Sequence, residues 1–414
     1  MGVPLIERVI RSAREAGADD FYVVTGYQGE HVRTFLKGLT DRTGIPITAI
    51  VNGDWEKANG LSVLKARPYL RDPFLLLMAD HLFEPSIARE VVELPFADGE
   101  VTLGVDRNIA NGLIDMEDVT RVKTEGGKIN NIGKGLTDFN GFDTGIFRCS
   151  PAIFSALERC AAESGDTSLS GAVRVLAGEG RAKAADINGH FWTDVDDPKT
   201  IKQAESALLA HLGDKPSDGP VSGYLNRPLS MWFTRRLVNY AITPNQISLF
   251  SFVCSVLAAG LFALGGYLAL VLGGFLAQFA SIVDGCDGEV ARLKFQTSRY
   301  GGWLDAVLDR YADALLLFGL TWHAYADKTD SLILLTGFLA IIGSFMVSYT
   351  ADKYDRLMLD HIQHGKRFRL GRDVRIFLIF LGALFNQVPL TLVIIAAVMN
   401  VETIRRLIIC RDRG

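Results

Sequence analysis

The spacing of apolar residues changes character midway along the chain. In the first half, short apolar runs alternate with mixed segments that carry charges throughout. Three of these runs are typical of buried strands: 21–27, 47–52 and 74–80. Residues 4–17, ahead of the first run, have the spacing of an amphipathic helix. Strands that alternate with helices predict an α/β domain of the Rossmann-like type, with ligands at the carboxyl ends of the strands.

The second half holds long apolar spans with few charges. Six are visible: 247–267, 268–283, 303–325, 331–351, 374–386 and 389–409. A helix needs about 20 apolar residues to cross a bilayer, and the second and fifth spans reach that length only with their polar flanks. We expect an all-α polytopic membrane domain of about six transmembrane helices.

Basic residues gather in the connections on one side of these spans. Residues 292–299, 352–375 and 405–413 are rich in Lys and Arg, whereas 265–267 and 386–389 contain neither. By the positive-inside rule, this predicts a multi-pass protein of the cell membrane with both termini in the cytosol.

The same patterns predict four segments. Residues 1–212 form the cytosolic domain, and 213–223, rich in Gly, Pro, Ser and Asp, form a linker. Residues 224–242 place apolar side chains at helical spacing with arginines between them, which is typical of a helix lying on a membrane surface. Residues 243–414 form the membrane domain.

Composition narrows the classes of function. The chain has 43 basic and 47 acidic residues, so it lacks the basic excess expected of a nucleic-acid-binding protein. Its five cysteines show neither paired spacing nor a zinc pattern. This favours a reduced protein that faces the cytosol over a disulfide-stabilised one.

Four aspartates beside the apolar spans carry the clearest chemistry. Asp284 and Asp287 are three residues apart and Asp305 and Asp309 are four apart, so each pair shares one face of a helix. Carboxylates gathered at a membrane repel one another and are costly to desolvate. Divalent cations relieve both costs, and oxygen ligands suit Mg²⁺ or Mn²⁺ bound together with phosphates. We therefore expect a site for two ions here, although a solvated helix end is the simpler alternative.

These residues belong to a longer pattern. Asp284-x-x-Asp287-Gly288-x-x-Ala291-Arg292, eight residues, then Gly301-x-x-x-Asp305-x-x-x-Asp309 resembles the complete signature of the CDP-alcohol phosphotransferase family. The resemblance covers roughly 224–410. It implies six helices, a homodimer, two metal ions, and displacement of CMP from a CDP-alcohol by a second alcohol.

The resemblance also implies roles for individual residues. The four aspartates would bind metal, and Asp309 would also act as the catalytic base. Four residues would line the nucleotide pocket: Gly288, Ala291, Arg292 and Gly301.

A second basic group lies in and after the 352–375 connection. Lys366, Arg372 and Arg375 are candidates for binding the phosphate of the acceptor, and the last two are three apart and would point the same way. The alternative is a loop that is basic only because it faces the cytosol.

The first half resembles the sugar-phosphate nucleotidyltransferases, and most closely the inositol-phosphate cytidylyltransferase group. The order of several short stretches carries this resemblance: 4–30, 52–66, 75–81, 118–136, 143–147 and 189–198.

Its chemistry is also readable from the residues. Asp80 ends a buried strand, and Asp194 and Asp196 alternate along an extended segment, so the three could hold Mg²⁺ against CTP. Lys134 would bind the sugar phosphate, and Asn59 would lie near the base. Each residue taken alone also fits an ordinary surface position.

One feature of the resembling family is missing. Its members begin with a strand and a Gly-rich loop of the kind AAGxGxR, and no such loop occurs in this chain. Backbone N–H groups in such loops bind phosphate, so we expect transfer from CTP to be badly impaired. Either the start codon is wrongly placed, or the front domain serves only as a structural module.

The favoured interpretation is an enzyme with two activities. The front domain would make CDP-inositol from CTP and inositol 1-phosphate, and the membrane domain would pass inositol phosphate to a second inositol 1-phosphate, giving a di-inositol phosphate phosphate. The first alternative is a phospholipid synthase that uses a CDP-activated lipid. A second keeps the front domain as a non-catalytic nucleotide sensor, and a transporter is the remaining alternative.

Overall fold

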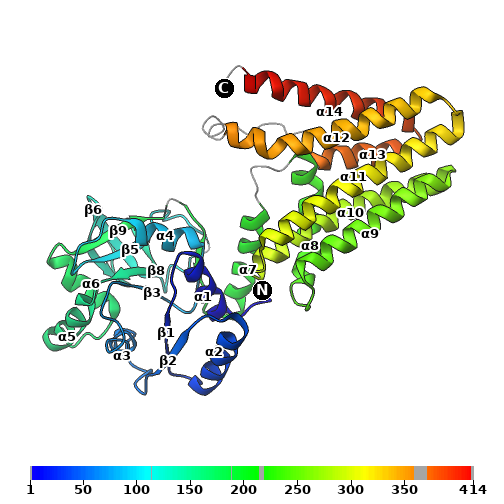
Figure 1. Ribbon diagram of the computed structural model, residues 1–414. Coiled ribbons are helices and arrows are strands. Elements are labelled where there is room, and N and C mark those ends of the chain that lie inside the picture. The colour runs from blue at the N-terminus through cyan, green and yellow to red at the C-terminus, as the bar shows by residue number, and fades with distance from the viewer. Residues whose placement is uncertain (1, 113, 188, 214–218, 359–370, 412–414) are drawn as a thin grey trace. The chain divides into compact units, whose positions relative to one another are not determined.

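A computed structural model of the chain describes residues 2–112, 114–187, 189–213, 219–358 and 371–411 (Figure 1). Two compact units are present. The front unit comprises Val3–Leu208, and the membrane unit comprises Leu209–Gly414 together with Met1–Gly2.

The front unit is an α/β domain, as predicted. Its helices are α1 (Leu5–Glu15), α2 (Gly29–Thr43), α3 (Gly60–Lys65), α4 (Pro85–Glu93), α5 (Ala152–Ser164), α6 (Leu169–Gly178) and the start of α7 (Pro198–Gly213). Its strands are β1 (Phe21–Thr25), β2 (Ile47–Val51), β3 (Phe74–Leu77), β4 (His81–Phe83), β5 (Val101–Asp106), β6 (Arg121–Glu125), β7 (Lys128–Gly133), β8 (Gly141–Cys149), β9 (Ala182–Asp186) and β10 (Trp192–Asp194). The three strands predicted from apolar runs correspond to β1, β2 and β3.

The strands form three separate ladders. The main sheet has the order β3-β8-β5-β9-β7-β6, while β1 pairs in parallel with β2, and β4 pairs antiparallel with β10. The main sheet is mixed, because β5 is antiparallel to β8 and parallel to β9. Val101, Leu103 and Val105 of β5 are fully buried, so this strand lies at the centre of the front-unit core.

The membrane unit is helical. It contains a π-helical turn (Ser222–Asn226) followed by α8 (Arg227–Leu237), α9 (Pro244–Leu264), α10 (Tyr267–Leu293), α11 (Arg299–Lys328), α12 (Ser331–Met358), α13 (Arg372–Leu384) and α14 (Val388–Arg411). Within the described ranges, three segments are long and apolar enough to cross a membrane: Pro244–Leu264, Tyr267–Leu293 and Ser331–Ala351. The count of six transmembrane spans therefore stays a prediction, while the six predicted apolar segments do form helices α9 to α14.

Local sequence explains where α9 begins. The Thr243 hydroxyl accepts a hydrogen bond from the Gln246 backbone, and the Gln246 side chain accepts one from the Thr243 backbone, with Pro244 in the first turn. This reciprocal cap satisfies two amide groups that a helix end leaves without partners. It fixes the end of α9 from which Ser248 and Ser251 reach the carboxylates.

Candidate active sites

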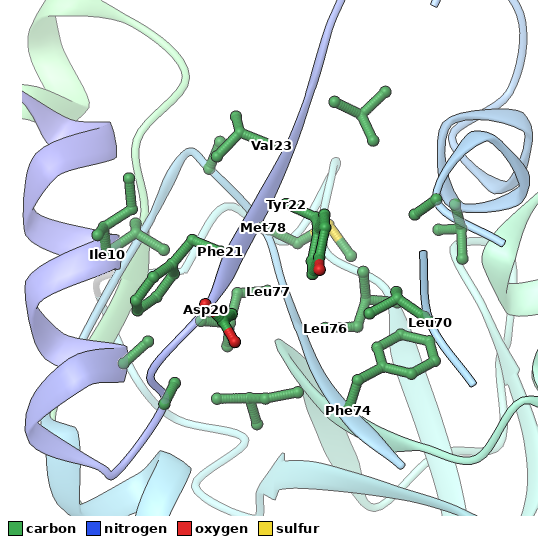
Figure 2. A pocket seen from close by; sticks show the side chains of 18 of the residues that line it. Ile10, Asp20, Phe21, Tyr22, Val23, Leu70, Phe74, Leu76, Leu77 and Met78 are labelled. Carbon is green, nitrogen blue, oxygen red and sulfur yellow. The ribbon is translucent and has the colours of Figure 1, made fainter. Parts of the chain in front are cut away.

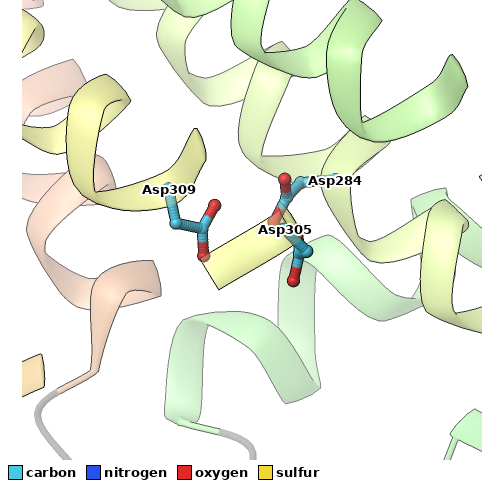
Figure 3. Close-up of side chains that lie close together, drawn as sticks. All are labelled: Asp284, Asp305 and Asp309. Atoms are coloured by element: carbon cyan, nitrogen blue, oxygen red, sulfur yellow. The ribbon is translucent and has the colours of Figure 1, made fainter. Parts of the chain in front are cut away.

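Three of the predicted metal ligands converge in the membrane unit. Asp284 lies on α10 and Asp305 and Asp309 lie on α11, and one carboxylate oxygen from each lies within 4.8 Å of the others. Figure 3 shows the three carboxylates near one another, Asp284 from α10 and the other two from α11. Asp287, the fourth predicted ligand, is close enough to Asp305 for their carboxyl groups to interact. The expected meeting of two aspartate pairs is thus present in the geometry.

Two serines on α9 orient the α10 aspartates. The Ser248 hydroxyl donates to an oxygen of Asp287, and the Ser251 hydroxyl donates to Oδ1 of Asp284 at 3.2 Å. The sequence analysis did not single out either residue. A signal was available, because the two hydroxyls are three residues apart on an apolar helix, which matches the spacing of the two aspartates.

Arg372 on α13 reaches into the carboxylate group. One of its terminal nitrogens lies 2.7 Å from Oδ2 of Asp284 and 2.6 Å from Oδ1 of Asp309, and its Nε donates to Asp313 at 3.2 Å. Arg372 therefore places one positive charge among the carboxylates of α10 and α11. Asp313, which is not among the predicted site residues, is buried and pairs with both arginines of α13.

Arg375 differs from the expectation of direct phosphate contact. Its side chain is 2% exposed, pairs with Asp313, and places another terminal nitrogen 3.7 Å from the sulfur of Met399. An arginine enclosed in this way has no open surface toward an acceptor, so its role is to hold Asp313 and, through it, Arg372. Lys366, the third candidate, lies outside the described residues.

The donor set fits a divalent cation. Oδ1 of Asp305 is buried and has no hydrogen-bond partner among the described residues, although a buried carboxylate oxygen ordinarily has one. Several carboxylates that share one partly buried space repel one another unless a cation lies between them. Oxygen-only donors of this kind are those that Mg²⁺ and Mn²⁺ prefer.

The predicted nucleotide-binding residues border this group. A Cβ added at Gly288 would lie 3.3 Å from a terminal nitrogen of Arg292. A Cβ added at Gly301 would lie 3.0 Å from the Ser298 hydroxyl and also crowd Asn245. Ala291 is buried. A side chain at Gly288 or Gly301 would therefore crowd neighbouring protein atoms, and the nucleotide pocket stays a prediction.

In the front unit, strand pairing brings the predicted carboxylates together. Asp80 follows β3, and the β4–β10 ladder places Asp194 directly opposite His81. Nε2 of His81 lies 3.7 Å from Asp80, while its Nδ1 is 2.7 Å from the Thr144 carbonyl oxygen. Asp80, Asp194 and Asp196 do not approach one another as closely as the membrane-unit aspartates among the described residues.

The charges of these carboxylates influence one another. Burial raises the pKa of Asp194, and the nearby Asp118 and Asp80 raise it further, while His81 opposes them. The pKa of Asp196 is raised by burial and then by Asp194 and Asp80. Mutual repulsion of this kind is relieved by a bound cation, so the electrostatics agree with the predicted Mg²⁺ site.

The two predicted substrate residues of the front unit have protein partners. Lys134 forms an exposed ion pair with Asp118 at 2.5 Å. The side-chain oxygen of Asn59 accepts a hydrogen bond from the backbone of Leu169 at 3.0 Å, so this oxygen supports the start of α6. Asn59 precedes α3 and also lines a cavity.

That cavity lies where the sheet is interrupted. A space of about 560 Å³ is bounded by β1 on one side and β3 on the other, with α1 and α3 contributing apolar walls (Figure 2). Its lining includes Tyr22, Val23, Leu76 and Met78. In the part of the chain that the structure describes, neither β1 nor β3 has a strand partner on this side. The sequence analysis did not foresee the cavity, which ends at Met78 and Ala79, just before Asp80.

Comparison with known proteins links both units to one kind of enzyme. The family model described as CDP-alcohol phosphatidyltransferase matches residues 241–404. A bifunctional IPC transferase and DIPP synthase of Rubrobacter xylanophilus is 37% identical over 98% of this chain and 90% of its own length. A protein of the same name from Aquifex aeolicus is 33% identical over 97% and 90%. The solved inositol-1-phosphate CTP transferase from T. maritima has 27% identity and a TM-score of 0.43, and covers 49% of this chain and 80% of that one.

Proposed function

Because the chain belongs to the family of bifunctional IPC transferases and DIPP synthases, we propose that it carries out two successive reactions. The front unit transfers a cytidylyl group from CTP to inositol 1-phosphate. The membrane unit then transfers inositol phosphate from CDP-inositol to a second inositol 1-phosphate, releasing CMP. The product of the first reaction is the donor of the second, which accounts for the fusion of the two units.

The group of aspartates on α10 and α11 carries the proposal for the membrane unit. Asp284, Asp287, Asp305 and Asp309 would hold divalent cations, with the buried Oδ1 of Asp305 available as a donor. Bound Mg²⁺ ions neutralise charge that develops on a diphosphate under attack. Ser248 and Ser251 hold the α10 carboxylates in place for that role.

Residues of the membrane unit would also remove the proton of the acceptor hydroxyl and bind the acceptor phosphate. The acceptor hydroxyl attacks the phosphorus that bears the donor inositol, the bond from that phosphorus to the CMP oxygen breaks, and Asp309 takes the hydroxyl proton. Arg372 binds the acceptor phosphate, because its guanidinium lies next to Asp309 and can form paired hydrogen bonds to phosphate. Arg375 and Asp313 hold Arg372 in position.

In the front unit, Asp80, Asp194 and Asp196 would bind Mg²⁺ together with the triphosphate of CTP. The phosphate oxygen of inositol 1-phosphate attacks the α-phosphorus, and pyrophosphate leaves. Lys134 would exchange its partner Asp118 for the incoming sugar phosphate. Because this ion pair is exposed, breaking it costs little free energy.

The test measures CMP release by the purified chain in detergent with Mg²⁺. We expect release with CDP-inositol and inositol 1-phosphate together, none without an acceptor, and loss of release in Asp309→Asn. Release from CDP-diacylglycerol but not from CDP-inositol would replace the proposal with a phospholipid synthase. Substrate flux across vesicles without CMP release would instead indicate a transporter.

A further inference from the structure

A second buried charge lies on α10, close to the aspartates but directed elsewhere. Glu289 is 1% exposed and occupies a variable position of the family signature, two residues after Asp287. Successive helical residues are rotated by about 100°, so Glu289 points about 200° away from Asp287. It therefore faces α8 and takes no part in the carboxylate group. Neither the signature nor the proposed reactions use it.

Within the described ranges, the hydrogen-bond partners of this carboxylate all lie on α8. Oε1 lies 2.9 Å from a terminal nitrogen of Arg227 and 2.7 Å from the Ser230 hydroxyl, and Oε2 accepts from the Thr234 hydroxyl at 2.7 Å. The three partners are themselves buried. We call Arg227, Ser230, Thr234 and Glu289 the α8–α10 polar cluster.

Further polar contacts continue along the same side of α10. Gln278 donates to Asn226 at 2.8 Å, and the Cys286 thiol lies 3.4 Å from the Ser230 carbonyl oxygen. Beyond the cluster, the Lys294 ammonium donates to the carbonyl of Tyr240 at 2.6 Å. Polar contacts between α10 and α8 with its flanking residues thus lie on both sides of the α10 segment that carries Asp284 and Asp287.

A buried ion pair is weak evidence for stability, because desolvation offsets most of the attraction, but its geometry specifies one arrangement. Rotating α10 to redirect Asp287 would remove Glu289 from three partners at once and leave its charge buried and unpaired. The two faces of α10 are therefore coupled through one rigid helix.

Resting on the proposed function of the membrane unit, we infer that Glu289 is a positioning residue for phosphotransfer. Held by Arg227, Ser230 and Thr234, it sets the rotation of α10 that aims Asp284 and Asp287 at the aspartates of α11. Groups that orient metal ligands commonly change metal affinity or activity by about 10- to 100-fold when removed.

The experiment compares Glu289→Gln with Glu402→Gln in the full chain in detergent. Glu402 is a matched control, because it is also a buried glutamate of the membrane unit paired with arginines. It lies on α14, and its ion-pair partners Arg405 and Arg406 are on the same helix. All variants carry Asp80→Asn to weaken the front-unit site. Mn²⁺ binding is followed by electron paramagnetic resonance, and thermal midpoints are recorded in parallel.

We expect Glu289→Gln to raise the Mn²⁺ dissociation constant about tenfold, and Glu402→Gln to leave it unchanged at a similar thermal midpoint. Unchanged affinity in Glu289→Gln, or an equal loss in Glu402→Gln, overturns the inference. If Glu289→Gln does not fold, Thr234→Val decides, because it removes one hydrogen bond and keeps the ion pair; unchanged affinity there also overturns the inference. Mn²⁺ binding needs no substrate, so wild-type protein that binds Mn²⁺ but releases no CMP refutes the proposed function alone.

Discussion

At the scale of single residues, Ser248, Ser251 and Arg372 orient the carboxylates of α10 and α11 through contacts between helices. Asp284, Asp287, Asp305 and Asp309 form a pattern at helical spacing that identifies a shared face without tertiary information. Ser248 and Ser251 resemble ordinary polar residues of an apolar helix until α9 is packed beside α10. The enclosure of Arg375 by Asp313 and Met399 could not be foreseen either, since it depends on contacts distant in sequence.

We predict that Ser251→Ala weakens catalysis by the membrane unit. The variant removes the hydroxyl that donates to Asp284, and a hydrogen bond to a charged group contributes about 1.5–3 kcal/mol, which corresponds to a loss of about tenfold or more in kcat/KM for CMP release. Ser255→Ala is the control, because that buried hydroxyl donates to the Ser251 carbonyl oxygen and, among the residues described, to no carboxylate. Equal losses in the two variants would contradict an orienting role.

The pH dependence of stability offers a second prediction at this scale. Burial raises the pKa of Asp143 to about 6, while the Gly145 N–H and His81 oppose the shift. A carboxyl whose pKa is higher in the folded state contributes stability below its unfolded pKa, and this contribution is lost as the pH rises through the folded value. The thermal midpoint of the wild type should therefore fall between about pH 4 and pH 6 relative to that of Asp143→Asn. Parallel curves for the two proteins would refute this assignment.

At the scale of elements, apolar periodicity located strands and helices but not their ends or gaps. The predicted span 268–283 ends where the aspartates begin, yet α10 continues to Leu293. In a hydropathy pattern, polar residues mark the end of a span. Here residues of α8, α9 and α13 form hydrogen bonds and ion pairs with the polar side chains of α10, so the helix continues. The gap in the sheet could not be predicted either, because the sequences of β1 and β3 do not indicate which of their edges is paired.

The gap between β1 and β3 predicts how the front unit responds to an added strand. Helix α1 has 11 residues and β1 has five, so both are about 17 Å long, and a strand joined ahead of Leu5 by a short loop would run parallel to β1 inside the cavity. It would pair with two open edges and bury apolar side chains. We expect fusion of a five-residue Val/Ile-rich strand to raise the thermal midpoint of the front-unit transition and to reduce binding of an apolar dye. A Gly/Ser strand of the same length is the control, and an equal rise with it would exclude strand pairing.

At the scale of the whole molecule, two chemistries are encoded in separately folded units. Each has its own apolar core, one around Leu103 and Phe147 and another around Phe262 and Leu316, so we expect damage to one site to leave the other unit folded. The division was readable from the change in hydrophobic pattern, and both families were recognisable from motif order. The identity of the substrates was harder to predict, because no contact of a described residue distinguishes inositol from another polyol.

The separation of the two sites leads to a complementation prediction. Asp309→Asn should lower CMP release by about 10²- to 10⁴-fold, the usual contribution of a general base, and leave pyrophosphate release from CTP unchanged. Asp80→Asn should show the reverse. Because CDP-inositol is a free intermediate in the proposed scheme, the two variants mixed in detergent with CTP and inositol 1-phosphate should form the di-inositol product that neither makes alone. Phosphorus NMR measures all species together. If each variant lost both activities, the two sites would not be independent. If both reactions persisted in each single variant while the mixture formed no di-inositol product, the assignment of Asp80 and Asp309 to separate steps would be wrong.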